Sequence, residues 1–249
     1  MPGDSRRHQF PNTGAILATA EKVDNIAAAF AVGEPPSGSK DPYGLRRAAA
    51  GIVTIAFAHD FRYDVAELVQ QAYSRLESFQ GLLPAQEVVP PATEFILERL
   101  LKNLTDEGLP RDAVEAVLPT SRDLIDLRSR AQAVQAFRGG PGWEDLVTVF
   151  TRPSNLAKKL AADDVRPVDI VDPGASTCRV AAAVSPELFA VEAEHALFEA
   201  WQATATHVAQ AVWAEKYDEA LAALAGLRPP VDRYFDDVLV MADDQAVRV

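Results

Sequence analysis

This sequence is poor in cysteine and histidine, and it has no long apolar run. Cys178 is the single cysteine, so no disulfide can form within the chain and a reducing compartment is expected. No stretch approaches the ~18 consecutive apolar residues that a membrane-spanning helix needs. Residues 1–12 are polar and lack the apolar centre of a signal peptide. We therefore expect a soluble, cytoplasmic protein.

The four histidines are scattered and show no paired spacing. The segment "AHDF" contains His59 and Asp60, the pair found in metal-dependent phosphohydrolases. That chemistry needs a further upstream His and a distant Asp to complete the metal site. We therefore predict no metal site and interpret the pair as a His at a helix end beside a capping Asp.

The charge is unevenly distributed along an acidic chain. The net charge of −12 argues against a basic nucleic-acid-binding domain, but it allows a local basic patch. Residues 128–160 carry six cations against two acids, whereas residues 187–219 carry seven acids against one lysine. An acidic chain with one basic segment can direct a polyanion to one face.

Apolar residues recur at helical spacing, and no stretch alternates as a strand does, which predicts an all-α fold. The 249 residues allow one large domain or two small ones, and the Pro-rich stretch 82–92 is the best candidate for a boundary. We expect helices at about 13–30, 42–55, 65–79, 93–107, 111–118, 121–137, 143–162, 188–212 and 217–226.

The segment "PSGSKDPYGLRRAA", residues 36–49, places three cations in an acidic chain. Asp41 is the expected N-cap of the next helix, with Pro42 as the first helical residue. The segment lacks the full phosphate-loop pattern, and no strand precedes it. It is either a capped connection between helices or a contact with phosphate or an acidic partner surface. The cations concerned are Lys40, Arg46 and Arg47.

The segment "FTRPSNLAKKL", residues 150–160, is a second basic motif. Arg152, Asn155 and Lys159 share one face if a helix continues through Pro153. Arg and Asn can read base edges, and Lys binds phosphate. The alternative is a solvated basic face. Three aromatic residues flank the segment and either stack on unpaired bases or pack in the core: Phe137, Trp143 and Phe150.

Four segments together resemble the β subunit of the bacterial heterotetrameric glycyl-tRNA synthetase. Residues 16–53 contain "PSGSKDPYGLRRAA", which is similar to the family pattern P-T-G-S-x-D-P-[FY]-x-L-R-R-A-A. The similarity continues in "LRSRAQAVQAF" (127–137), "FTRPSNL" (150–156) and the stretch 217–248. The resemblance covers nearly the whole chain in order and spacing.

The resemblance implies two helical domains. Residues 1–83 are expected to be the end of an HD-like domain, in which Asp24 matches the last Asp of the HD pattern. Residues 84–249 are expected to be a DALR-type anticodon-binding domain, with "DQAVR" (244–248) as a loose form of its Asp-Ala-Leu-Arg motif. The chain then corresponds to a C-terminal fragment of a longer subunit, truncated before a last helix.

The resemblance also implies a role. The family enzyme joins glycine to its tRNA with ATP and Mg²⁺ on its α subunits, and the β subunit supplies tRNA recognition. This chain is therefore expected to be non-catalytic and to hold no cofactor. Its expected partners are tRNA(Gly), the α subunit and the rest of the β subunit. The alternative is a helical scaffold that docks these protein partners with little tRNA contact.

Family position and charge clustering together predict the tRNA contacts. The second and third letters of the glycine anticodon are both cytosine, whose pairing edge suits Arg and Asn. Arg130 borders an apolar stripe, so an ion pair within the fold is its alternative role. The predicted anticodon-loop contacts are Arg130, Arg138, Arg152 and Asn155, and the predicted phosphate contacts are Lys158 and Lys159.

Overall fold

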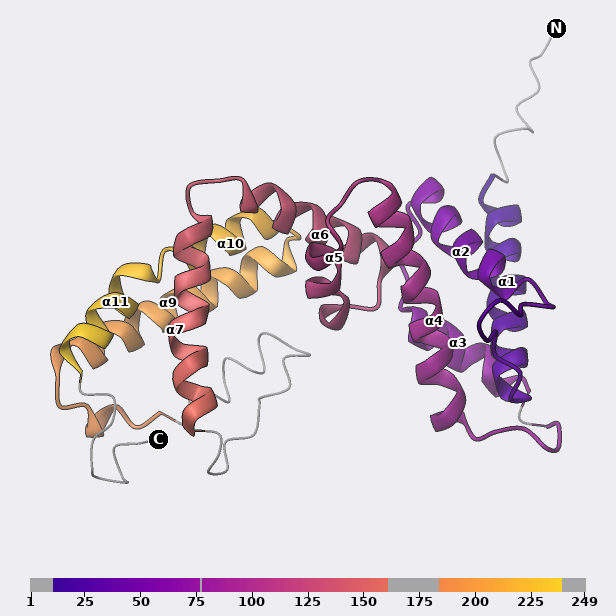
Figure 1. The fold of residues 1–249 in the computed structure, drawn as a ribbon, viewed down its shortest axis with the longest axis horizontal. Helices are drawn as coiled ribbons and strands as arrows, with labels where there is room; N and C mark the ends of the chain where they lie inside the picture. Colours follow the sequence, from indigo (N-terminus) through magenta and orange to yellow (C-terminus); the bar gives the residue numbers. More distant parts are fainter. Residues whose placement is uncertain (1–10, 77, 161–183, 239–249) are drawn as a thin grey trace, which may run out of the picture. The chain divides into compact units, whose positions relative to one another are not determined.

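The computed structural model describes residues 11–76, 78–160 and 184–238, which fall into two compact units. Unit 1 ends at Ala131 and unit 2 begins at Gln132. The described residues form helices and no strand, and the only bridges among them are isolated (Figure 1). The predicted all-α class is confirmed. None of the helices in these ranges is long and apolar enough to cross a membrane.

Unit 1 is a helical bundle in which α1 (Pro11–Ala31), α2 (Leu45–His59), α3 (Val65–Ser74) and α4 (Ala85–Asp106) pack on one another (Figure 1). The chain continues through α5 (Arg111–Val117), the short 3₁₀ helix η1 (Leu118–Thr120) and α6 (Leu124–Arg138). Large apolar side chains from all four main helices are fully buried: Ile26, Ile52, Val69, Ile96 and Leu100.

Helix α4 begins eight residues before the predicted start at 93, so the prediction for this end of the helix was wrong. Pro90 and Pro91 lie inside the helix and remove two backbone donors. Val88 and Ala92 on either side of them are fully buried, and this packing offsets the lost hydrogen bonds. The stretch 82–92 is therefore largely helical, and α4 contacts α1, α2 and α3. The boundary at residue 83 between the HD-like domain and the DALR-type domain stays a prediction.

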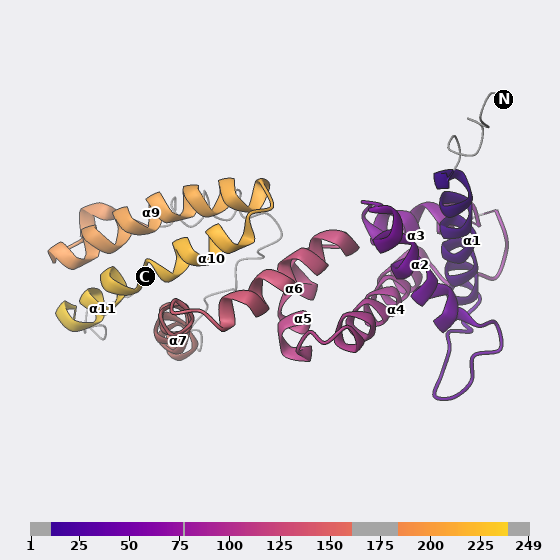
Figure 2. The same cartoon turned by 90° about the horizontal axis from the view of Figure 1, so that it is seen from above.

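Unit 2 consists of α7 (Trp143–Leu160), α9 (Glu192–Trp213), α10 (Tyr217–Ala225) and α11 (Arg228–Asp237), with the 3₁₀ helix η3 (Pro186–Leu188) before α9. Helices α9 and α10 lie side by side in both views (Figures 1 and 2). Helix α7 continues through Pro153, as the shared basic face required. The small core of this unit centres on Val149, Leu227 and Val231.

Two helices of the C-terminal region differ from their predictions. Helix α11 was not predicted, because Pro229 and Pro230 resemble a loop, although proline is well tolerated in the first turn of a helix. The long helix predicted from 188 begins only at Glu192. The "DQAVR" motif at 244–248 lies outside the described residues.

The side chain of Asp41, four residues before the first residue of α2, fixes the start of this helix. Its carboxylate accepts hydrogen bonds from the backbone N–H of Leu45 at 2.8 Å and of Arg46 at 3.0 Å. The side chain of Asp41 thus binds the first N–H groups of the helix, but the N-cap residue is Gly44, so the predicted positions of Asp41 as N-cap and Pro42 as first helical residue were wrong. Gly44 precedes the helix with φ 67°, a left-handed conformation that few other residues adopt readily. Burial raises the pKa of Asp41, but the two backbone hydrogen bonds and the nearby arginines outweigh it and lower the pKa.

We expect Asp41→Ala to lower the free energy of unfolding by about 1 kcal/mol at pH 7, the usual cost of removing a helix cap. The lowered pKa means that the contribution of Asp41 is complete above its ordinary value of 3.8 and is lost as the pH falls through the lower folded value. Urea unfolding at pH 7 and in acid measures both effects.

Asp106→Ala is the matched control, because it removes an exposed carboxylate whose ion-pair partner among the described residues is the exposed Lys102. An Asp41 variant as stable as this control at pH 7 would contradict the capping role.

Candidate nucleic-acid interface

A tight turn lies at the centre of the connection between α1 and α2. The backbone N–H of Ser37 donates to the carbonyl of Lys40 at 3.2 Å, and the N–H of Lys40 donates back at 2.9 Å. The Arg46 guanidinium donates to the carbonyl of Gly38 at 2.7 Å and more weakly to that of Lys40 at 3.5 Å. Arg46 therefore holds the turn against the first residues of α2.

The other two cations of this connection face solvent. Lys40 and Arg47 are both exposed, and neither forms an ion pair within the described part of the chain. The structure thus divides the three predicted contacts into one arginine that is used by the fold and two cations that are presented outward.

Arg130 adopts its alternative role. Its Nε atom donates to both carboxylate oxygens of Asp126, at 3.0 and 2.9 Å, one turn earlier on α6. The two side chains are only 21% and 12% exposed. Arg130 also belongs to unit 1, whereas the other predicted anticodon-loop residues belong to unit 2. The structure therefore shows an ion pair within the helix at this position.

Arg138 and Trp143 form a cation–π pair across the corner between α6 and α7. The guanidinium carbon lies 5.3 Å from the centroid of the indole ring, and both residues are half-buried. The stretch "GGPG" between them makes this sharp corner. A planar guanidinium held on an aromatic ring is a surface on which an unpaired base can stack.

Arg152 takes part in an ion-pair network between α7 and α11. It donates to Asp232 at 2.6 Å and lies over the ring of Phe235 at 5.1 Å. Arg228 donates to the other oxygen of Asp232 at 2.8 Å and to Asp145 at 3.1 Å. The hydrogen bond from Arg228 is the largest effect on the pKa of Asp232 and lowers it. Burial raises this pKa by less, and the hydrogen bond from Arg152 lowers it further.

The remaining predicted residues lie on the last two turns of α7. Asn155 is exposed on the face that it shares with Arg152. The side chains of Lys158 and Lys159 lie outside the described residues. Phe150 on the same helix is 52% exposed, so it does not pack in the core as aromatic residues commonly do.

Sequence reasoning missed Arg228 and Asp232, which anchor Arg152. The signal was present in "RPPVDRYFDD", where these two residues stand four apart, the spacing of a helical ion pair. It was missed because the segment was not predicted to be helical.

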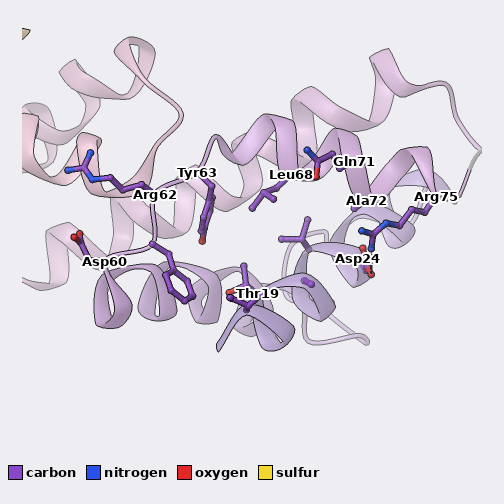
Figure 3. A pocket seen from close by; sticks show the side chains of 13 residues that line it. Thr19, Asp24, Asp60, Arg62, Tyr63, Leu68, Gln71, Ala72 and Arg75 are labelled. Carbon is purple, nitrogen blue, oxygen red and sulfur yellow. Dashed lines mark ion pairs between the residues drawn. The ribbon is translucent and has the colours of Figure 1, made fainter. Parts of the chain in front are cut away.

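A cavity of about 320 Å³ opens between α1, α3 and the loop that joins α2 to α3 (Figure 3). Asp24 from α1 and Arg75 after α3 form an ion pair of 3.8 Å that borders it. Its wall is otherwise mostly apolar. The described residues contain no group of three or more side chains placed to hold a metal ion. The cavity residues thus offer apolar contact, hydrogen bonds and charge. The apolar residues of the cavity wall include Val23, Phe61, Leu68 and Ala72.

Tyr63 is the unusual residue of this cavity. Its hydroxyl is buried and has no hydrogen-bond partner in the described structure. Burial, and to a lesser extent the charge of Asp123, raise the pKa of Tyr63 to about 12, so the phenol stays protonated at neutral pH. Asp60 ends α2 in a left-handed conformation with φ 51°, and its backbone N–H bonds to Ala56, so His59 stands at a helix end as predicted.

The comparisons with known proteins agree with the resemblance read from the motifs. A family model described as "Glycyl-tRNA synthetase beta subunit" matches residues 4–119. The chain is 36% identical over 238 residues to the glycine–tRNA ligase β subunit of Desulforudis audaxviator (strain MP104C). This alignment covers 94% of the chain. The chain belongs to the glycyl-tRNA synthetase β-subunit family.

Two further β subunits show the same extent of similarity. That of Ectopseudomonas mendocina (strain ymp) is 38% identical over 95% of this chain, and that of Azotobacter vinelandii (strain DJ / ATCC BAA-1303) is 37% identical over 96%. The alignments cover 31–33% of the three relatives. The chain therefore spans about a third of the length of the curated relatives that it matches.

We expect Asp232→Ala to lower the melting temperature of the protein. The substitution leaves Arg152 and Arg228 close together without the carboxylate that both bind, and it removes the Arg152–Asp232 link between α7 and α11, although Arg228 still bonds to Asp145. Asp237→Ala is the matched control on the same helix, because its partner Arg233 is exposed and belongs to α11 itself. Calorimetry should show the larger decrease for Asp232→Ala, and equal decreases would contradict the bridging role.

We expect Tyr63→Phe to leave the free energy of unfolding unchanged or to raise it by up to about 1 kcal/mol, because it removes a buried hydroxyl without a partner. Tyr73→Phe is the comparison, since the Tyr73 hydroxyl donates to the carbonyl of Leu83 at 2.8 Å. Loss of that hydrogen bond should cost about 1 kcal/mol. Urea unfolding of both variants checks the difference, and equal destabilisation would show that Tyr63 has a partner in solution.

Proposed function

We propose that this chain is the tRNA-recognition part of a glycine–tRNA ligase β subunit. The observation that carries the proposal is its similarity to β subunits of that ligase over 94–96% of its length. Within this proposal, residues 1–83 belong to an HD-like domain and residues 84–249 to a DALR-like anticodon-binding domain. The chain itself is non-catalytic.

The proposed role places the chemistry elsewhere in the assembly. Glycine is joined to its tRNA with ATP and Mg²⁺ at the α subunits, so this chain needs no cofactor of its own. Its partners are tRNA(Gly), the α subunit and the remainder of the β subunit. Because tRNA charging takes place in the cytoplasm, the proposal also places the protein there.

In this proposal, accessible side chains of unit 2 contact the bases of the anticodon loop. Asn155 is exposed and can bond to a cytosine edge, and the Arg138–Trp143 pair can stack on an unpaired base. Arg152 shares its guanidinium with Asp232, so we assign it mainly to holding α7, which carries Asn155. Lys158 and Lys159 follow on the same helix and remain the proposed phosphate contacts.

A second candidate function is supported by an apolar groove in unit 2. A cavity of about 600 Å³ opens among α7, η3, α9, α10 and α11. Its wall is mostly apolar and aromatic, as in grooves that receive a partner helix. The acidic segment 187–219 also suits a protein partner better than RNA. The alternative is therefore a scaffold that docks other parts of the ligase. The groove residues include Phe150, Leu188, Phe198, Trp201 and Val231.

Fluorescence anisotropy of the purified chain against a labelled glycine tRNA transcript tests the proposal. A second transcript with both anticodon cytosines changed is titrated beside it over a salt series. We expect weaker binding to the changed transcript by ~1–3 kcal/mol per altered base, the usual cost of a mismatched base contact. Equal, salt-sensitive binding to both transcripts would limit the role to phosphate contact. No binding would favour the scaffold.

Asn155→Ala sharpens this test. We expect it to reduce the discrimination between the two transcripts, while Gln202→Ala, which removes an exposed amide from α9, leaves the discrimination unchanged. Discrimination that survives Asn155→Ala in full would remove this residue from the proposed site.

A further inference from the structure

We propose that the connection between α1 and α2 is a binding site for the phosphate backbone of RNA. In this site Lys40 and Arg47 contact phosphate, and Arg46 positions the turn that carries Lys40. The inference rests on the proposed tRNA role, and it deepens that role by assigning an RNA contact to residues of unit 1, whereas Arg138, Arg152 and Asn155 belong to unit 2.

The first step is that the acids of this connection are already engaged. The Glu34 carboxylate accepts a hydrogen bond from the Tyr43 hydroxyl at 2.8 Å. Both oxygens of Asp41 accept backbone N–H groups of α2. Lys40 and Arg47 form no ion pair with any described residue, so their charges remain available to an external anion.

The second step is that the fold holds the turn in place. Gly38 has φ 52° and lies between the reciprocal hydrogen bonds of Ser37 and Lys40. Arg46 ties this turn to the start of α2 through the carbonyls of Gly38 and Lys40. Figure 2 shows the connection extending beyond the ends of α1 and α2. Lys40 is thus exposed on a loop whose conformation is held by hydrogen bonds.

The third step concerns Arg47 and Gly44. A Cβ atom on Gly44 would come within 3.0 Å of the Nη2 atom of Arg47, so the absence of a side chain gives the guanidinium room beside the backbone. The left-handed conformation of Gly44 turns the chain from the loop into α2. Gly44 therefore makes the turn, and the guanidinium of Arg47 lies close beside its backbone.

The chemistry favours phosphate over an acidic protein surface. Guanidinium and ammonium groups without a carboxylate partner suit phosphate oxygens, and Arg can bind them in a bidentate manner. The exposed Ser37 and Ser39 stand beside Lys40 and add hydroxyl donors of the kind that often contact nucleic-acid phosphate. In a chain of net charge −12, such a site gives a polyanion one local point of attraction.

The test compares the whole chain with its double variant Lys40→Ala/Arg47→Ala in anisotropy titrations against the glycine tRNA transcript. The affinity should fall about tenfold at low salt, and the slope of log K against log salt should become shallower by about 1 per cation removed. Because phosphate carries no sequence information, the loss should be the same for the transcript with the changed anticodon. An unchanged affinity and slope would overturn the proposal.

Lys102→Ala/Arg111→Ala is the matched control. It removes the same two charges from unit 1, but both residues form exposed ion pairs within their own helices, with Asp106 and Glu115. The control should bind within twofold of the unaltered chain. A loss equal to that of the Lys40/Arg47 variant would show that only net charge matters and would overturn the site.

Arg46 is tested through the shape of the turn. Arg46→Lys keeps the charge but lacks the planar guanidinium whose two Nη atoms bond the two carbonyls, so it should weaken RNA binding and speed hydrogen exchange of the Lys40 amide. The Lys40→Ala/Arg47→Ala variant should leave exchange at residue 40 nearly unchanged. If Arg46→Lys retains full RNA affinity, the positioning role of Arg46 is wrong.

The outcomes separate this inference from the proposed function. If the unaltered chain discriminates between the transcripts and the double variant binds equally well, the inference fails and the tRNA role stands. If neither form discriminates but the double variant loses affinity, the phosphate site stands and anticodon reading fails. If the double variant keeps RNA binding but loses association with the α subunit, the loop is a protein contact and the inference fails.

Discussion

The burial of α4 among α1, α2 and α3 is the interaction on which unit 1 depends. Val88, Ile96, Leu100 and Leu104 of this helix are fully buried, and they hold it helical in spite of two consecutive prolines. Complete burial of each such side chain contributes ~1.5–3 kcal/mol. The four together therefore contribute more than the two hydrogen bonds that the prolines remove. The packed bundle in turn gives the α1–α2 connection a fixed base.

Competition for carboxylates decides what the cations of this chain can do. Arg130, Arg152 and Arg228 bind acids of the fold, whereas Lys40 and Arg47 have no such partner in the described residues. An arginine that is bonded to Asp232 and lies over Phe235 stabilises helix packing before it meets any ligand. The cations without an acidic partner in the described residues are therefore fewer and more local than the count of basic residues implies.

The local features of the fold were predictable because they depend on near neighbours in the chain. Helical spacing of apolar residues identified α1, α7 and α10 nearly to their ends, and the capping role of Asp41 followed from its place before an apolar run. The starts of α4 and α11 were missed because proline is a strong local signal for a break. In α4 burial against distant helices overrides that signal, whereas in α11 the prolines stand in the first turn, where they are well tolerated.

The sequence alone determined the helical class, the family through the long motif at 36–49, and the positions of the basic residues. The tertiary structure decided which of these residues already bind another group of the fold. Asp232 stands 80 residues from Arg152. Asp41 accepts backbone N–H groups of α2 and forms no ion pair with Arg47, which stays exposed nearby. Spacing along a chain cannot show such partners, because ion pairs and hydrogen bonds depend on distances in space.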